Sequence, residues 1–339
     1  MVTNLTNLTT QNIVPLQWSH KIFGIDKVGF EQTALEIFRF QYDHNALYAG
    51  YANAVHKSPD NVNSLLDIPF LPIRFFKSHE VKTTSFESDI FFESSGTTGT
   101  INSRHFIKNI ALYEESFLKG FEQEYGKISD WCIIGLLPSY LERKNASLVY
   151  MVQELINKSG HSASGFYLDE FEKLSTTLIT LEATGQKTLL IGVTYALLDF
   201  AEKFPQPLQH TVIMETGGMK GRRRELIRDE VHQILKNAFS VSAVHSEYGM
   251  TELLSQAYSP GEGLFFPPAW MQILIRDEED PLLIKENGKG IINVIDLANV
   301  YSCSFIATDD AGIVNADGNF EVLGRVDGSD LRGCSLIEK

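Results

Sequence analysis

Apolar residues recur at steps of three and four along several segments, the spacing that places them on one face of an α-helix. Phe30, Ala34, Ile37, Phe38 and Tyr42 predict a helix within residues 28–56. The same spacing predicts further helices over 113–121, 147–156, 194–204 and 222–239. Thr194 stands where a side chain can cap the first turn of the helix that it begins.

Short continuous apolar runs lie between these helices and predict buried strands. They cover residues 91–93, 131–137, 188–193, 210–214 and 241–244. Strands that alternate with helices in this way indicate an α/β fold with a largely parallel sheet.

The pattern changes past residue 265, where short apolar runs are separated by Gly, Asp and Asn turns. The runs lie at 272–275, 291–295, 303–307 and 320–323 and predict a β-rich subdomain with hairpins. We therefore expect two domains, an α/β region over 1–264 and a β-rich C-terminal subdomain over 265–339.

Two N-terminal segments are expected to lack long helices. The first 27 residues are rich in Asn and Thr and should form a loosely held arm. Pro69 and Pro72 exclude a long helix over 68–81, so an extended loop is expected there.

Composition and charge narrow the class of protein. The chain has 339 residues, 43% of them hydrophobic, enough to bury a core without disulfides or metals. Its formal charge of -14 disfavours a nucleic-acid partner or an anionic membrane surface. There is no apolar stretch of about 18 residues that would span a membrane, and the N-terminus lacks the features of a signal peptide. Three Cys cannot form a disulfide framework, so we expect a cytoplasmic protein.

The first candidate binding segment is the loop Ser94-Ser95-Gly96-Thr97-Thr98-Gly99-Thr100, which follows a predicted strand. Two glycines let the backbone turn its N–H groups inward, and five hydroxyls add donors, an arrangement suited to phosphate oxygens. The loop is not a P-loop, because no Gly-Lys-Ser/Thr follows. On composition alone, an ordinary Ser/Thr/Gly turn stays open as the alternative.

Three further motifs are short and could each be a simple turn. Glu215-Thr216-Gly217-Gly218-Met219 ends a predicted strand, where open α/β sheets place ligands. Tyr248-Gly249-Met250-Thr251-Glu252 follows another strand-like run. In the β-rich part, Thr308-Asp309-Asp310-Ala311-Gly312 is followed by Gly324-Arg325-Val326-Asp327.

In this order and spacing, the four motifs resemble those of the adenylate-forming superfamily, which contains acyl-CoA synthetases, peptide-synthetase adenylation domains and luciferases of the firefly type. The resemblance implies the fold of that superfamily's N-terminal domain. It implies that residues 94–100 bind the ATP phosphates, that Gly217, Gly218 and Met219 frame the adenine, and that Tyr248, Gly249 and Met250 contact AMP. It further implies a magnesium ligand in Glu252, a ribose-binding carboxylate in Asp310, and catalytic roles for Thr251 and Arg325.

The sequence departs from the superfamily pattern at two places. The Lys that usually follows the phosphate loop is absent, and Arg104 is the nearest cation that could replace it. The chain also ends shortly after Asp327, so the small mobile C-terminal domain, with its catalytic Lys and CoA site, is expected to be missing.

The segments 68–77, 137–140 and 217–220 narrow the resemblance to the acyl-protein synthetase (LuxE-type) family of bacterial bioluminescence operons, over most of residues 65–338. That family implies two steps. A carboxylic acid, expected to be a fatty acid, and ATP give acyl-adenylate, and the acyl group then passes to a cysteine near the enzyme's C-terminus. A protein partner such as a reductase would collect it.

The three cysteines differ in their sequence surroundings. Cys132 and Cys303 lie in apolar strand-like runs and are expected to be buried and inert. Cys334 lies in a polar segment beside Arg332, which favours the reactive thiolate. We therefore expect Cys334 to accept the acyl group.

The sequence thus predicts a ligase that uses ATP and Mg²⁺ to activate a carboxylic acid and acylates its own cysteine. Two alternatives stay open at this point. One is a truncated acyl- or aryl-CoA ligase, and the other is a non-catalytic protein that binds nucleotide or acyl-AMP. The identity of the acid, the final acyl acceptor and the oligomeric state are not given by the sequence.

Overall fold

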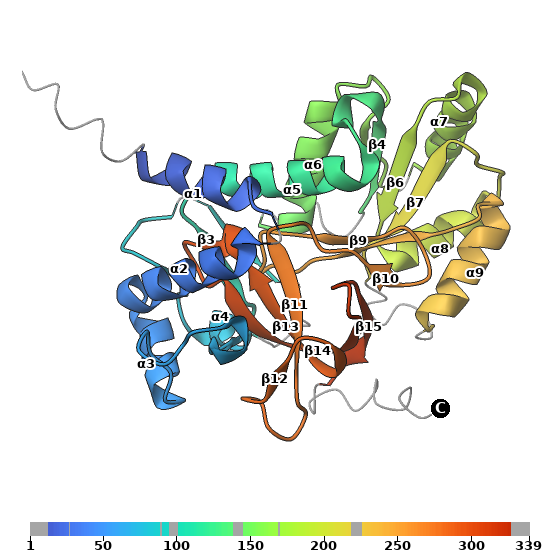
Figure 1. Cartoon of the computed structure of the whole chain (residues 1–339). Helices are drawn as coiled ribbons and strands as arrows, with labels where there is room; N and C mark the ends of the chain where they lie inside the picture. The colour runs from blue at the N-terminus through green and yellow to red at the C-terminus, as the bar shows by residue number, and fades with distance from the viewer. Residues whose placement is uncertain are drawn as a thin grey trace, which may run out of the picture.

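The computed structural model describes residues 13–26, 28–88, 90–94, 101–137, 145–168, 170–217 and 226–326. Two large sheets and their helices organise these residues (Figure 1). Among the described helices, none has both the length and the apolarity that a membrane span needs.

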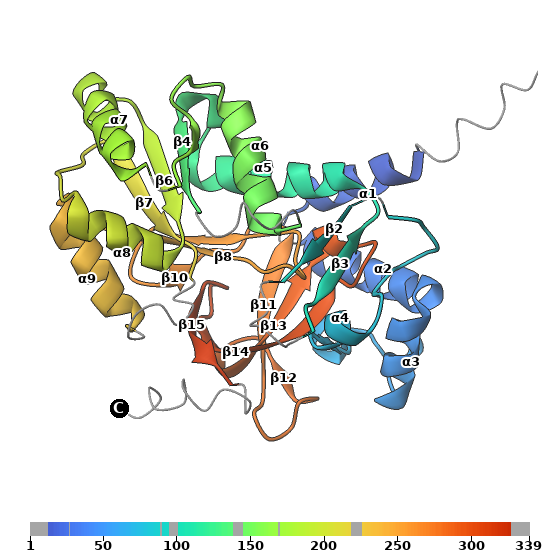
Figure 2. The same ribbon diagram turned by 180° about the vertical axis from the view of Figure 1, so that it is seen from behind.

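The first sheet has the strand order β5-β4-β6-β7-β8-β9, and only β9 runs antiparallel to its neighbour. β4 and β6 are buried along their whole length, as expected for parallel strands covered on both faces. The predicted α/β alternation is confirmed, with helices on either side of the sheet in Figures 1 and 2. The strands are β4 Cys132–Leu136, β5 Gly165–Phe166, β6 Thr188–Gly192, β7 Thr211–Glu215, β8 His245–Tyr248 and β9 Ala257–Ser259, and the helices are α5 Ile110–Tyr125, α6 Ser147–Ser159, α7 Phe171–Thr184, α8 Thr194–Lys203 and α9 Arg228–Phe239.

The second sheet has the order β10-β15-β14-β13-β11-β12, with β1 added in parallel beside β14. The β-rich character past residue 265 is therefore confirmed, while the domain boundary at 264 stays a prediction. The motif from Thr308 to Gly312 lies inside a strand, and the pairing shifts by one residue between Ala311 and Gly312. The strands are β1 Leu71–Pro72, β10 Leu264–Phe265, β11 Met271–Arg276, β12 Ile284–Lys285, β13 Gly288–Asp296, β14 Phe305–Val314 and β15 Phe320–Arg325.

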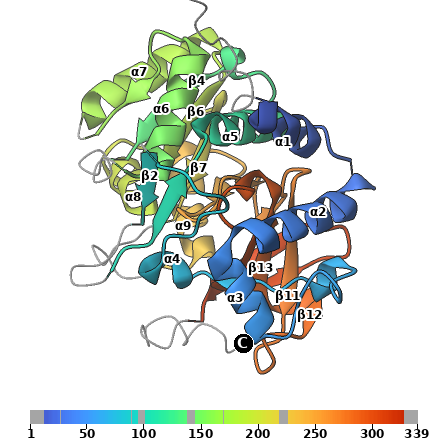
Figure 3. The ribbon, with the colours of Figure 1, turned by 90° about the vertical axis from the view of Figure 1, so that its left-hand side faces the viewer.

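The N-terminal helices lie against the second sheet, as Figure 3 shows for α2 and α3. Phe38 of α2 meets Phe305 of β14 edge to face at 6.4 Å. The buried amide of Gln41 donates to the carbonyl oxygens of Asn299 and Val300 and accepts from the Ser304 N–H. The helices of this N-terminal part are α2 Gly29–His44, α3 Ala46–Ala54, the short α4 Phe75–Ser78 and α1 Ile13–Phe23, which lies along α5 instead of the sheet (Figure 1).

Three N-terminal expectations need correction. The supposed arm contains α1, which is tied to α5 by a hydrogen bond from Ser19 Oγ to Glu115 (2.5 Å), while residues 1–12 lie outside the described part. The helix expected over 28–56 is interrupted at Asn45, whose side chain accepts from Tyr48 N–H and caps α3. The loop expected over 68–81 contains β1 and α4.

Three further boundaries differ around the first sheet. Val193, not Thr194, precedes the first turn of α8, and the Thr194 hydroxyl donates instead to Glu215. The strand expected over 241–244 begins only at His245. The described part of the helix expected over 222–239 is α9, which begins at Arg228, and the Ile227 N–H just before it donates to Glu230; residues 222–225 lie outside the described part.

A separate hairpin carries the first candidate motif. It pairs β2 Ile90–Glu93 with β3 Arg104–Ile107 in antiparallel register (Figure 2). The strand expected at 91–93 is therefore confirmed, and the predicted phosphate loop is the connection between the two strands.

Candidate functional site

Ser94 closes the base of the hairpin loop. Its N–H donates to the Ser103 carbonyl at 3.1 Å, and its hydroxyl accepts from the Ser103 N–H at 2.9 Å. Ser95, Gly96, Thr97, Thr98, Gly99 and Thr100 lie outside the described residues. The described part therefore shows how the two ends of the predicted phosphate loop are held together.

Arg104, the nearest cation to the position of the absent Lys, begins β3. Its Nε donates to Glu93 Oε1 at 2.9 Å, directly across the hairpin. The guanidinium is largely exposed. An exposed pair of this kind contributes little stability, so Arg104 could exchange this partner for a phosphate at small cost.

Tyr248, Asp310 and Arg325 come together from three strands. The Tyr248 hydroxyl donates to Asp310 Oδ2 at 2.9 Å, and Arg325 Nε lies 3.4 Å from Asp310 Oδ1. β8 supplies the tyrosine, β14 the aspartate and β15 the arginine. Burial raises the pKa of Asp310, and the charge of Arg325 with the Tyr248 hydrogen bond offsets part of that rise.

Glu252 lies beside this group, with 5% of its surface exposed. Burial raises the pKa of its carboxyl, while a hydrogen bond with Ser103 and the charges of Arg325 and Lys77 act in the opposite direction. Ser103 adjoins the hairpin loop, so this carboxyl connects the loop with the Tyr248–Glu252 segment.

The backbone of that segment is fixed on both sides. The carbonyl oxygen of Thr251 lies 2.8 Å from His105 Nδ1 of β3, and that of Glu252 accepts from Asn299 Nδ2 at 2.7 Å. Burial lowers the pKa of His105 to about 4, so this imidazole is neutral at physiological pH and donates through Nδ1. The Thr251 side chain, predicted as catalytic, is half-buried, as are Gly249 and Met250.

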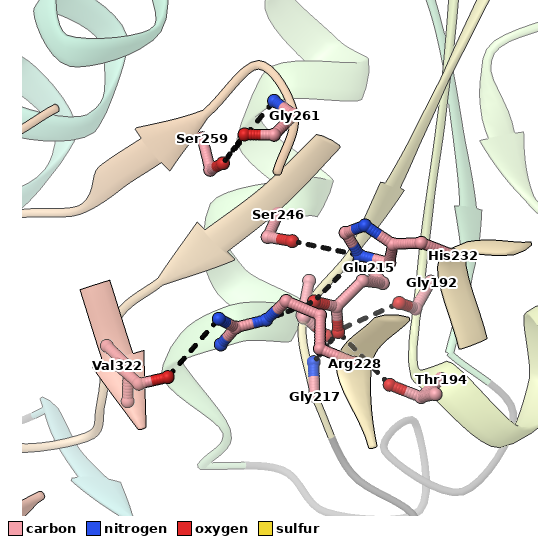
Figure 4. A network of polar contacts seen from close by, with 11 residues as sticks. Gly192, Thr194, Glu215, Gly217, Arg228, His232, Ser246, Ser259, Gly261 and Val322 are labelled. Atoms are coloured by element: carbon pink, nitrogen blue, oxygen red, sulfur yellow. Dashed lines mark hydrogen bonds and ion pairs between the residues drawn. The ribbon is translucent and has the colours of Figure 1, made fainter. Parts of the chain in front are cut away.

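Glu215 organises the predicted adenine turn at the carboxyl end of β7 (Figure 4). Its Oε2 accepts from the Gly217 N–H at 2.7 Å and from the Thr194 hydroxyl at 3.1 Å. The Thr194 N–H in turn donates to the Gly217 carbonyl. Gly217 has a φ of +72°, which glycine adopts without strain, whereas Gly218 and Met219 lie outside the described residues.

Two basic side chains face the other oxygen of Glu215. Oε1 lies 3.8 Å from His232 Nε2 and 4.0 Å from Arg228 Nε. Burial opposes ionisation of Glu215, but the hydrogen bonds of His232, Ser246 and Gly217 and the charge of Arg228 outweigh it and lower the pKa to about 2. Arg228 also donates to the Val322 carbonyl of β15, so the turn is connected to the second sheet.

The sequence motif contains Glu215 but predicts no role for it, and no sequence feature predicted that His232 and Arg228 belong to the site. The available signal was a carboxylate directly after the apolar run of β7 and before two glycines. His232 and Arg228 gave no such signal, because only the fold brings α9 beside this turn.

The cysteines agree with their predicted surroundings where they are described. Cys132 and Cys303 are buried. Burial raises the pKa of both thiols, that of Cys303 to about 12, so neither is a ready nucleophile. Cys303 precedes β14 rather than lying within it. Cys334 lies outside the described residues.

The metal expectation rests on Glu252 alone. Among the described residues, no group of three or more His, Cys, Asp or Glu could hold an ion. Mg²⁺ is commonly bound by one or two carboxylates together with substrate phosphates, so a single buried carboxyl beside the predicted phosphate loop fits this ion when nucleotide is present.

Comparison with known proteins identifies the family of the chain. The model of the family described as "Acyl-protein synthetase, LuxE" matches residues 8–338. A long-chain-fatty-acid–luciferin-component ligase of Vibrio harveyi is 22% identical over 323 residues, which cover 88% of this chain and 84% of that protein. A protein of the same name from Photorhabdus luminescens is 38% identical over 71 residues, 20% of this chain and 60% of its own.

Solved structures share the fold. A 2-hydroxyisobutyryl-CoA ligase in the postadenylation state aligns with a TM-score of 0.61 at 10% identity, over 91% of this chain and 70% of its own. ATP-bound MatB from Rhodopseudomonas palustris aligns with a TM-score of 0.51 at 20% identity, over 82% of this chain. The alignment spans 56% of the length of MatB. The fold is therefore that of adenylate-forming enzymes, and the chain belongs to the LuxE family of acyl-protein synthetases, a family of ligases.

Proposed function

We propose that the protein activates a carboxylic acid with ATP and then transfers the acyl group to its own Cys334. The observation that carries the proposal is the convergence of Tyr248, Asp310 and Arg325 beside Glu252 and the hairpin loop. The names of the curated relatives support a fatty acid as the substrate class.

The first step joins the acid to AMP. A carboxylate oxygen attacks the α-phosphorus of ATP, the bond to the departing pyrophosphate breaks, and acyl-adenylate forms. Negative charge grows on the phosphoryl oxygens and on pyrophosphate, so preorganised donors that face these oxygens lower the barrier. The residues proposed for this task are the 94–100 loop and Arg325, and Asp310 is proposed to hold the ribose hydroxyls.

Glu252 is the residue proposed to hold Mg²⁺, which would neutralise phosphate charge when bound. A bound cation would also favour the ionised form of this buried carboxyl. The chain's own contribution is to hold Glu252 in place through its contacts with Ser103 and Asn299.

The second step moves the acyl group. The Cys334 thiolate attacks the acyl carbonyl carbon, the bond from that carbon to the AMP oxygen breaks, and AMP leaves with the electron pair. The burial of Cys132 and Cys303 leaves Cys334 as the candidate nucleophile. A partner such as a reductase is proposed to collect the acyl group from the thioester.

Two measurements test the proposal. ATP–pyrophosphate exchange across a panel of carboxylic acids should reveal acyl-adenylate formation. Incubation with ATP and a radiolabelled acid should then give a hydroxylamine-labile label on the wild type and on the Cys132→Ala control. Cys334→Ser should keep the exchange and lose the label.

The alternatives predict different results. A truncated CoA ligase would leave the protein unlabelled and produce acyl-CoA when CoA is added. A non-catalytic binding protein would show no exchange with any acid. A label that persists in Cys334→Ser would overturn the assignment of the cysteine while leaving adenylation intact.

A further inference from the structure

The pair of strands β8 and β9 presents two different faces. Residues on a strand alternate between the faces, so Ser246 and Tyr248 share one and Glu247 lies on the other. Tyr248 uses its face to reach Asp310. Glu247 is paired across the ladder with Tyr258, so these two side chains share the face opposite to the ribose-binding contact.

Three polar groups on that opposite face lack hydrogen-bond partners within the described part of the chain. Gln256 Oε1 and the Tyr258 hydroxyl are buried without a partner. Glu247 is half-buried, and its carboxyl makes no hydrogen bond with any described residue. Burial, together with the negative charge of Glu215, raises the pKa of Glu247 to about 8.

Gly249 shows where the Glu247 carboxyl lies. A Cβ atom on Gly249 would stand 2.2 Å from Glu247 Oε1 and 3.2 Å from Gln256 Cγ. The carboxyl therefore occupies the space over Gly249, beside Gln256. Gly249 belongs to the Tyr248–Glu252 segment proposed to contact AMP, so the Glu247 carboxyl lies directly against the start of that segment.

Aromatic rings border the same face. The ring of Tyr258 meets that of Tyr125 from α5 edge to face at 5.4 Å. Tyr113 of α5 lies close enough to Glu247 for the two groups to influence each other's ionisation. The polar groups thus lie against the aromatic side chains of α5, next to the segment Tyr248–Glu252 that is proposed to contact AMP.

An arrangement of this kind is costly without a ligand. A buried polar group without a partner destabilises a protein, and native proteins contain few of them. Unpaired groups gathered on one face beside a binding site are therefore best explained by a ligand that completes their hydrogen bonds.

We propose that Glu247, Gln256 and Tyr258 form a subsite for a hydrogen-bond-donating substituent, a hydroxyl or an amino group, close to the carboxyl group of the acid substrate. This inference rests on the proposed function and narrows its substrate class. The amide oxygen of Gln256 can only accept, so the substituent must donate a hydrogen. An unsubstituted chain, or an ether in the same place, would leave that oxygen unpaired.

Exchange assays with matched acids test the subsite. The probes are octanoic acid and its 3-hydroxy, 3-amino and 3-methoxy derivatives, with 2-hydroxyoctanoic acid to test the distance from the carboxyl. One of the donating acids should exceed octanoic acid in kcat/KM by about 10²-fold, because sites built to hydrogen-bond a substrate strongly reject analogues that lack the group. The methoxy acid should gain nothing.

Variants assign the preference to residues. Glu247→Ala and Gln256→Leu should each bring the ratio of the donating acid to octanoic acid toward one. Glu172→Gln, an exposed change on α7, should keep the wild-type ratio. If the enzyme prefers 3-aminooctanoic acid and Glu247→Gln loses this preference, the subsite forms an ion pair with the amino group. If it prefers a hydroxy acid, the subsite forms a neutral hydrogen bond. Thermal midpoints without ligand report folding, and they should rise in Gln256→Leu, which removes an unpaired buried acceptor.

The outcomes separate this inference from the proposed function. Equal or better use of octanoic acid, or an unchanged ratio in folded Glu247→Ala and Gln256→Leu, would overturn the subsite while adenylation stands. The absence of exchange with every acid would overturn the proposed function, and with it the subsite.

Discussion

The carboxyl group of Glu252 interacts with three separate parts of the chain. It forms a hydrogen bond with Ser103 and is attracted by the charges of Arg325 and Lys77. Glu252→Gln keeps the shape of the side chain and removes its charge. ATP–pyrophosphate exchange should fall by about 10²-fold or more, the scale for losing one electrostatic contact to a transition state. The exposed control Glu172→Gln should retain full exchange. Unchanged exchange in a folded Glu252→Gln protein would show that this carboxyl binds no essential cation.

Glu247 makes stability depend on pH, because its pKa is raised from 4.5 to about 8. Between these values the folded protein holds a proton that the unfolded chain has released. The contribution to stability is therefore complete below pH 4.5 and is lost as the pH rises through about 8. Glu247→Gln should be more stable than the wild type at pH 8.5, by about 1–3 kcal/mol, the range for relieving a poorly solvated buried group.

Denaturant unfolding of Glu247→Gln and wild type at pH 5.5, 7 and 8.5 measures this difference. It should grow with pH. A difference that is constant over this range would mean that the carboxyl titrates normally.

At the scale of elements, Glu215 stabilises the turn after β7 by accepting hydrogen bonds from the Gly217 N–H and the Thr194 hydroxyl. Glu215→Gln removes the charge that faces His232 and Arg228, so the turn should loosen and the KM for ATP should rise by about tenfold. Glu182→Gln is a matched control, because Glu182 accepts from Gln209 N–H and the Thr211 hydroxyl at the opposite end of the same strand. It should cost stability without changing the KM for ATP. Equal effects of the two variants on that KM would reduce Glu215 to a structural role.

The contribution of Glu215 to stability changes with pH in the direction opposite to that of Glu247. Its pKa is lowered from 4.5 to about 2, so its contribution is present above pH 4.5 and is lost as the pH falls toward 2. The difference in unfolding free energy between wild type and Glu215→Gln should therefore shrink over that acidic range, measured by denaturant unfolding.

Sequence patterns located the strands that contain a continuous apolar run, and they missed β8, whose residues are mostly polar. β6 reads as an apolar run because both of its faces are covered. β8 instead begins with the polar residues His245, Ser246 and Glu247, so the apolar pattern ended before the strand began. His245 lies 3.0 Å from the Tyr125 hydroxyl of α5, and Ser246 lies 3.4 Å from His232 of α9. Motif resemblance pointed to Asp310, but its contacts with Tyr248 and Arg325 depend on strand pairing that no local pattern contains.

For the molecule as a whole, the distribution of cysteines predicts a simple chemical signature. Cys132 and Cys303 are buried, with thiols whose pKa is raised. The native protein should therefore release about one equivalent of thionitrobenzoate rapidly from Ellman's reagent, and Cys334→Ser almost none. Unfolding in guanidinium should expose the other two thiols. A rapid equivalent that persists in native Cys334→Ser would contradict the assignment.

The hydrogen bonds of Gln41 with Asn299 and Ser304 join segments that the ribosome makes at very different times. Gln41 and Asn299 are 258 residues apart, and β1 likewise pairs with β14. While the ribosome is still producing the middle of the chain, α2 can pack against Tyr48 of α3 but lacks the part of its packing surface that Phe305 of β14 supplies. Contacts of such long range slow folding and leave apolar surface exposed to aggregation. During synthesis, α2 therefore stays partly uncovered until β14 has been made. A chaperone that covers α2 in this period would raise the yield of native protein.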